Sequence, residues 1–161
     1  LETVPGTRLA VIGDGPARGD METYFSGTPT KFMGYMKGEA LSAAYASADM
    51  FVFPSAMETF GLVVVEAMAA GLPVVASRVG GIPDVVDIGV NGYTFEVNDI
   101  AGMIDGVRQI ATNRARITQM GQAARAFAES QSWDTMMDEV VDLYVTMIAE
   151  ATGEQAAVSA A

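Results

Sequence analysis

Short apolar runs, separated by turns and by helical patterns, organise the first hundred residues. The expected strands are residues 8–13, 30–34, 50–53, 73–77 and 93–97. They are mostly apolar and do not alternate between apolar and polar residues, which is typical of parallel strands that helices cover on both faces. Helical spacing fills most of the intervals between them, at residues 17–25, 39–48 and 61–70. The alternation predicts an α/β fold with a doubly wound parallel sheet and helices on both faces.

Residues 61–70 fit either a strand or a helix. Their three consecutive valines favour a strand, whereas the length of the segment, its final EAMAA and the stop at Gly71 favour a buried helix, which we predict. Residues 82–87 are expected to form a short helical turn at best. From Asp99 onward the spacing is helical in three pieces, at residues 99–111, 114–129 and 133–149.

These elements predict one α/β domain over residues 1–129, a C-terminal helix over 130–152 and a frayed tail over 153–161. The chain begins without an initiating Met, and a strand follows almost at once. We therefore expect the chain to be an internal piece of a longer protein.

Composition narrows the possible functions. Hydrophobic residues make up 50% of the chain, which is enough for a core at this size. The formal net charge of -11 argues against nucleic acid and anionic membrane as general partners of this domain. With no Cys and no His, the chain has no disulfide or thiol chemistry and lacks the commonest general base and transition-metal ligand. No apolar run reaches the roughly 18 residues of a transmembrane span.

The segment PSAMETFGLVVVE, from Pro54 to Glu66, carries the candidate chemistry. It runs from a strand end through a loop into a helix, whose first N–H groups and positive dipole end favour a phosphate. Gly61 has no side chain, so a ligand can approach the backbone there. Glu58 lies in the loop, and Glu66 lies in an apolar helix, where a carboxylate is costly without a partner. That partner is a ribose diol or, equally well, a neighbouring loop.

Residues 47–86 (SADMFVFPSAMETFGLVVVEAMAAGLPVVASRVGGIPDVV) resemble the signature of the family 4 retaining glycosyltransferases. Glu58 and Glu66 match that family's motif of two glutamates separated by seven residues, and the likeness extends over about residues 8–126. It implies the GT-B architecture, two Rossmann-like domains facing a cleft, with this chain in the C-terminal, donor-binding domain. The first strand of that domain, an upstream Arg and Lys that touch the diphosphate, and the acceptor domain would lie outside the chain.

The resemblance also implies roles for individual residues. Glu58 would be the catalytic-site carboxylate that binds hydroxyls of the donor sugar, and Glu66 would bind the ribose. The remaining donor contacts would come from the backbone, at Thr59, Phe60, Gly61 and Leu62 for the sugar and diphosphate, at Tyr35 and Met36 for the base, and less directly at Gly13 and Gly15 for the diphosphate. No metal or other cofactor is expected, because helix dipole and basic side chains would stabilise the leaving diphosphate of the nucleotide-sugar co-substrate. Retention would follow from front-face attack, and the isolated chain is expected to be inactive.

The run from Glu58 to Val86 is most similar to the sulfolipid synthase branch of the family, which implies sulfoquinovosyl transfer from UDP-sulfoquinovose to diacylglycerol. Arg78 is a candidate for the sulfonate, or else a solvated loop residue. The pair Gly80 and Gly81 brings N–H groups to the donor or simply allows a tight loop. The lipid or small-molecule acceptor would bind the absent N-terminal domain. Localisation would be at plastid membranes for a plant or algal sulfolipid enzyme, and cytoplasmic otherwise.

Other functions compete with this interpretation. Another family 4 hexosyltransferase would share every motif named above. A nucleotide-sugar 2-epimerase would share the architecture, although the absence of His and the EAMAAG helix count against it. A binding module without catalytic activity is a third class, against which the presence of both Glu58 and Glu66 argues.

Overall fold

The computed structural model describes residues 4–131 and 133–152. Strands and helices alternate, and the elements are β1 (Leu9–Ile12), α1 (Arg18–Tyr24), β2 (Thr30–Gly34), α2 (Gly38–Ala46), β3 (Phe51–Phe53), α3 (Leu62–Ala69), β4 (Val74–Ser77), α4 (Ile82–Val85), β5 (Gly92–Phe95), α5 (Ile100–Ala111), α6 (Arg114–Ser130) and α7 (Trp133–Thr152). Each predicted strand and helix is present, with bounds that differ by at most a few residues. The helical choice for residues 61–70 is confirmed, and the predicted tail lies outside the described residues.

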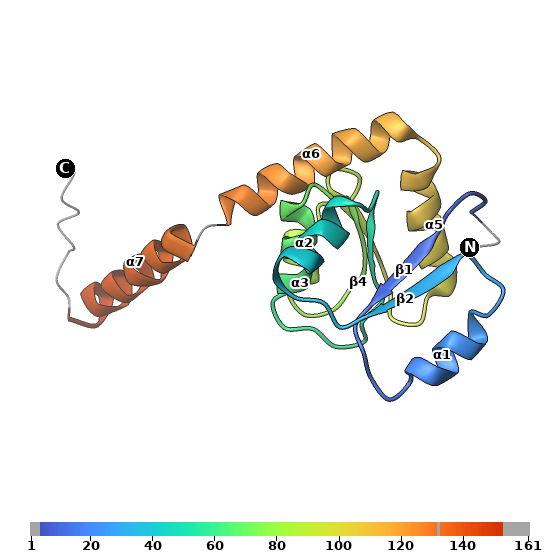
Figure 1. Cartoon of the computed structure of the whole chain (residues 1–161). Coiled ribbons are helices and arrows are strands. Elements are labelled where there is room, and N and C mark those ends of the chain that lie inside the picture. Colours follow the sequence, from blue (N-terminus) through green and yellow to red (C-terminus); the bar gives the residue numbers. More distant parts are fainter. Residues whose placement is uncertain (1–3, 132, 153–161) are drawn as a thin grey trace.

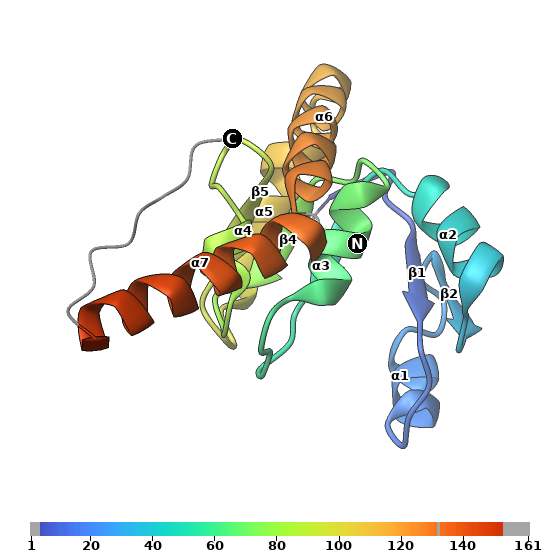
Figure 2. The same cartoon turned by 90° about the vertical axis from the view of Figure 1, so that its left-hand side faces the viewer.

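The strands form two parallel sheets. β1 pairs with β2, and β3, β4 and β5 pair in that order. The α/β class and the parallel direction of the strands are confirmed. Among the described residues no strand pairs with both β1 and β3, so the hydrogen-bonded ladder is interrupted between these two strands. In Figure 2, β1 and β2 lie with α1 on one side of the molecule, and β4 and β5 lie with α3 and α5 on the other.

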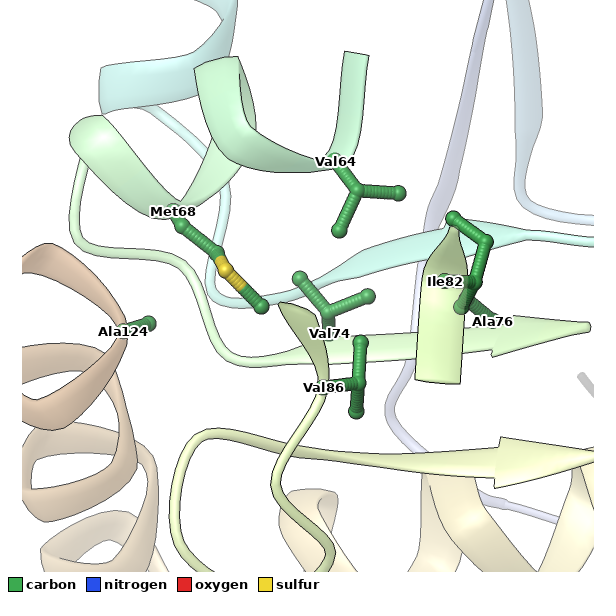
Figure 3. Packing of buried hydrophobic residues seen from close by; sticks show 7 residues of the cluster. All are labelled: Val64, Met68, Val74, Ala76, Ile82, Val86 and Ala124. Carbon is green, nitrogen blue, oxygen red and sulfur yellow. The ribbon is translucent and has the colours of Figure 1, made fainter. Parts of the chain in front are cut away.

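The core surrounds β4, all four residues of which are buried. On one face, Val74 and Ala76 pack with Val64 and Met68 of α3 and with α6, as Figure 3 shows. On the other face, Val75 packs with residues of α5, α6 and β5. Helices therefore cover both faces of this sheet, as the apolar runs predicted. Full burial of a Val side chain contributes about 1.5–3 kcal/mol, so Val74 and Val75 of β4 each stabilise the fold by about that much.

The C-terminal helices differ from each other. α6 packs along α3, and Gly121 permits a close approach, because a Cβ atom there would lie 2.3 Å from the Gly71 carbonyl oxygen. α7 extends away from the two sheets (Figure 1). Large apolar side chains of α7 are exposed, namely Met137, Val140, Val141, Leu143, Tyr144, Val145, Met147 and Ile148. The helix therefore adds little to the core around β4.

Candidate functional site

The loop that leaves β3 is the centre of the candidate site. β3 ends at Phe53, and Pro54 follows, which cannot donate to a ladder. The Ser77 hydroxyl donates to the Phe53 carbonyl at 3.4 Å, so the carboxyl ends of β3 and β4 are tied together. The loops that follow these two strands consequently emerge at the same edge of the sheet. In parallel α/β folds this edge is where ligands bind.

The loop ends at the N-terminus of α3. Its N-cap, Gly61, has φ 75°, a left-handed conformation that favours glycine, and no side chain caps the helix. The N–H groups of Val64 and Val65 donate to the Gly61 carbonyl at 2.9 and 3.1 Å. Because no side chain accepts from the first turn, this helix end presents N–H groups and a positive dipole end to the loop. The predicted loop-to-helix transition is therefore confirmed.

Glu58 lies in this loop and is half-buried. One oxygen of its carboxylate accepts from the Thr59 N–H at 2.8 Å, which fixes the side chain against the backbone. Residues of this loop and of the loop after β4 line an open hollow of about 660 Å³, namely Ala56, Met57, Glu58, Thr59, Val79 and Gly80. Glu58 thus belongs to a concave surface beside the start of α3.

Exposed apolar side chains surround this hollow. Met57 and Phe60 are 86% and 75% exposed, and Leu62 at the start of α3 is also exposed. Their neighbours on the loop are polar or small, so the surface around the hollow combines apolar and polar side chains. Of the predicted donor contacts, the structure brings together Glu58, Thr59, Phe60, Gly61 and Leu62, which are consecutive in the chain.

Glu66 lies one turn into α3, and its side chain is exposed. The expectation of a costly carboxylate in an apolar helix is wrong in this respect, because the buried residues of α3 are Val64, Ala67 and Met68. Glu66 nevertheless interacts with a residue of another helix that the sequence did not indicate. The pKa of Tyr45, on α2, is raised by its partial burial, and further by the negative charge of Glu66 and a side-chain hydrogen bond to it.

The other predicted donor contacts lie at the ends of β1 and β2. The Gly13 N–H donates to the Gly34 carbonyl at 2.8 Å, so these two strand ends converge. Gly15 donates its N–H to the Asp14 carboxylate at 2.8 Å, which makes the turn after β1. Tyr35 is 71% exposed, and Met36 is half-buried. In the part of the chain that the structure describes, no hydrogen bond or ion pair joins this group to the Glu58 loop, and its donor role stays a prediction.

Arg78 lies in the loop after β4. Its N–H donates to the Phe95 carbonyl at 2.7 Å, and its guanidinium lies 3.8 Å from the Glu96 carboxylate, with both side chains exposed. The side chain is accessible and loosely paired, as expected of either a solvated arginine or an anion-binding one. Its suggested contact with a sulfonate stays a prediction.

Within residues 4–131 and 133–152, no group of three or more His, Cys, Asp or Glu side chains is arranged to hold a metal ion. No helix in those ranges is long and apolar enough to cross a membrane.

Residues 2–113 match the family model described as glycosyl transferases group 1. Over 136 residues the chain is 44% identical to the sulfoquinovosyl transferase SQD2 of Arabidopsis thaliana, a match that covers 83% of this chain and 27% of that protein. It is 30% identical over 142 residues to a GDP-mannose-dependent alpha-mannosyltransferase of Corynebacterium glutamicum, covering 88% of this chain and 34% of that protein.

Among solved structures, sucrose-phosphate synthase from Thermosynechococcus elongatus is similar with a TM-score of 0.76 and 28% identity. The match covers 91% of this chain and 40% of that one. The chain therefore spans well under half the length of each of these three proteins.

Proposed function

Because the chain belongs to the glycosyl transferases group 1 family and has the corresponding GT-B fold, we propose that it forms the nucleotide-sugar-binding part of a glycosyltransferase. The observation that carries the proposal is the position of Glu58 beside the uncapped start of α3 at the carboxyl end of β3, with Glu66 one turn into the same helix. Two carboxylates and a helix N-terminus match the two ends of a nucleotide sugar, which has hydroxyl groups on either side of a diphosphate.

Each part of this group has a role in the proposed mechanism. The Glu58 carboxylate accepts hydrogen bonds from hydroxyls of the donor sugar, and the Glu66 carboxylate accepts them from the ribose. The N–H groups at the start of α3 face the diphosphate and stabilise the charge that develops on it as the glycosidic bond breaks. The acceptor hydroxyl attacks from the same face, and the sugar is transferred with retention of configuration.

The finer proposal is transfer of sulfoquinovose from UDP-sulfoquinovose to diacylglycerol. It is supported by 44% identity to a protein described as a sulfoquinovosyl transferase, against 30% to one described as GDP-mannose-dependent. Arg78 is the proposed partner of the sulfonate, because it is exposed beside the hollow-lining residues Val79 and Gly80. With a lipid acceptor the enzyme would act at a membrane, in plastids if the source is a plant or an alga. The comparisons give no support to the epimerase alternative.

Isothermal calorimetry with the full protein that carries this chain tests the proposal. The panel of donors is UDP-sulfoquinovose, UDP-glucose, GDP-mannose and ADP-glucose. Selective binding of UDP-sulfoquinovose supports both levels of the proposal. Preference for another donor retains the glycosyltransferase and contradicts the sulfolipid reaction, and binding of none contradicts both.

Variants locate the donor on the structure. Glu58→Gln and Glu66→Gln should each weaken donor binding by about 10- to 150-fold, the value of one charged hydrogen bond of 1.5–3 kcal/mol. Glu129→Gln is the matched control, since this exposed glutamate pairs with Arg125 on α6 away from the loop. Arg78→Ala should weaken UDP-sulfoquinovose more than UDP-glucose. Equal effects on both donors would remove Arg78 from sulfonate binding.

A further inference from the structure

The loop after β4 is in direct backbone contact with the loop that carries Glu58. The Gly81 N–H donates to the Thr59 carbonyl at 2.7 Å. A Cβ atom at Gly80 would lie 2.1 Å from the Glu58 carbonyl oxygen and 2.7 Å from its carbon. One at Gly81 would lie 3.0 Å from the Thr59 oxygen and 3.3 Å from the Phe60 Cα. The two glycines therefore form the surface on which residues 58–60 rest.

The contact cannot be relieved by a side-chain rotation. At Gly80 the neighbouring atoms belong to the backbone, so an added methyl group would displace one of the two loops. Gly80 also has φ +52°, a left-handed conformation that a side chain disfavours. Gly61 also has positive φ (+75°), and a Cβ atom there would lie 2.8 Å from Ile82 Cδ1, which unlike the backbone atoms near Gly80 is the end of a movable side chain. The backbone from Glu58 to Gly61 thus packs directly against residues 80–82.

This packing between the two loops matters because the Glu58–Gly61 backbone positions the groups that are proposed to bind the donor. The Glu58 carboxylate is held by the Thr59 N–H, and Gly61 is the N-cap of α3. A displacement of the Glu58 and Thr59 peptide would therefore move both the carboxylate and the entry to the helix. Binding groups must be held to within about 0.5 Å of their productive positions, so a shift of that size would reduce affinity.

We propose that Gly80 and Gly81 are positioning residues, which set the Glu58–Gly61 backbone in its donor-binding geometry. This deepens the proposed function and rests on it. The Gly81 N–H is already committed to Thr59, and it is accordingly not a donor to the nucleotide sugar. For Gly81, this hydrogen bond argues against one of the two roles that the sequence left open, the delivery of its N–H group to the donor.

The first test compares Gly80→Ala with Gly89→Ala in the full protein that carries this chain. Gly89 is a matched control, because it also has positive φ (+81°), whereas nothing lies within 4 Å of an added Cβ atom. In calorimetry with the donor that the parent binds best, Gly80→Ala should weaken binding at least tenfold and Gly89→Ala less than twofold. A folded Gly80→Ala protein that binds within twofold of the parent overturns the proposal. Gly81→Ala, whose closest contact is 3.0 Å, should show a weaker effect in the same direction and replaces Gly80→Ala if the latter does not fold.

A double-mutant cycle with Glu58→Gln separates positioning from a general loss of stability. If the glycine acts through Glu58, its substitution should cost at least fivefold less in the Glu58→Gln background than in the parent. A cost that is unchanged between the two backgrounds overturns the proposal.

A measurement without donor distinguishes failure of this proposal from failure of the proposed function. Amide hydrogen exchange of residues 58–61 and of Gly81 should speed up in Gly80→Ala and remain as in the parent in Gly89→Ala. Unchanged exchange in Gly80→Ala contradicts the proposed packing of residues 80–82 against residues 58–61. If exchange is faster in Gly80→Ala but the parent protein binds no nucleotide sugar, the packing between the two loops is supported and the donor site is contradicted.

Discussion

The two sheets of this molecule are built from similar apolar strands but have different surroundings. All four residues of β4 are buried, and helices lie on both faces of its sheet. Along β1 and β2, half-buried and exposed residues alternate, Ile12 and Met33 are each 37% exposed, and α1 has no buried residue. An apolar run therefore predicts a strand but not what covers it. The covering helices α5 and α6 come from the C-terminal part of the chain, and they pack on one sheet only.

The difference bears on the candidate site. The Glu58 loop and α3 belong to the covered sheet, where Val64 and Met68 anchor the helix in the core. Gly13 and Tyr35 belong to the ends of the less covered sheet. A binding group is best held by well-packed elements, so we expect the Glu58 half of the site to be the better preorganised one.

The largest expected effect comes from matched methionines in the two regions. Met68→Ala removes a fully buried side chain from α3 and should lower the free energy of unfolding by about 2–5 kcal/mol. Met33→Ala, on β2, removes a side chain that is already 37% exposed and should cost about 1 kcal/mol or less. Urea denaturation of both variants measures the difference. Equal losses would show that the β1–β2 region is packed as tightly as the core.

Helix glycines give a second, smaller contrast. Gly121→Ala in α6 would bring a Cβ atom to 2.3 Å from the Gly71 carbonyl oxygen, and we expect a loss of about 1–3 kcal/mol from the resulting displacement. Gly19→Ala in α1 has nothing within 4 Å and should stabilise the protein by roughly 0.5–1 kcal/mol through helix propensity. The thermal unfolding midpoint should fall for the first and rise for the second. A stabilising Gly121→Ala would mean that α6 does not press on the loop before β4.

Local pattern predicted the elements well. The strand Thr30–Gly34 is as expected, and the helix over residues 61–70 follows from its length and its stop at Gly71. The break between β1 and β3 agrees with the expectation that the first strand of the domain lies outside the chain, because that strand separates these two in a doubly wound sheet. Since the sequence around Glu66 is apolar almost throughout, periodicity could not show that this residue is exposed.

Contacts between loops were the least predictable part of the site. The packing of Gly80 against the Glu58 carbonyl joins residues 22 positions apart, and the sequence shows only a glycine pair. The electrostatic interaction between Tyr45 and Glu66 likewise joins two helices. Tyr45 is visible in the sequence AYASAD, but the residues around it do not distinguish a tyrosine that interacts with Glu66 from one that only packs in the core.

The smallest expected effect concerns that tyrosine and a counterpart on the less covered side. Tyr45→Phe removes a half-buried hydroxyl that interacts with the Glu66 carboxylate and, because Glu66 is exposed, should cost only about 0.5 kcal/mol at neutral pH. Tyr24→Phe, on α1, alters a side chain that is 82% exposed and should leave stability unchanged. Urea denaturation at pH 7 and at alkaline pH measures both variants against the parent.

The stability difference between the parent and Tyr45→Phe should change with pH in a definite direction. Because the folded state raises the pKa of Tyr45 above its ordinary value of 10.0, the unfolded chain loses this proton first as the pH rises. The stabilising contribution of Tyr45 is therefore complete below pH 10 and declines as the pH rises through the raised pKa. The advantage of the parent over Tyr45→Phe should accordingly narrow above pH 10, whereas Tyr24→Phe should remain level with the parent at pH 7. An advantage that is constant or grows with pH would show that neither burial nor the charge of Glu66 raises the pKa of Tyr45 in the folded state.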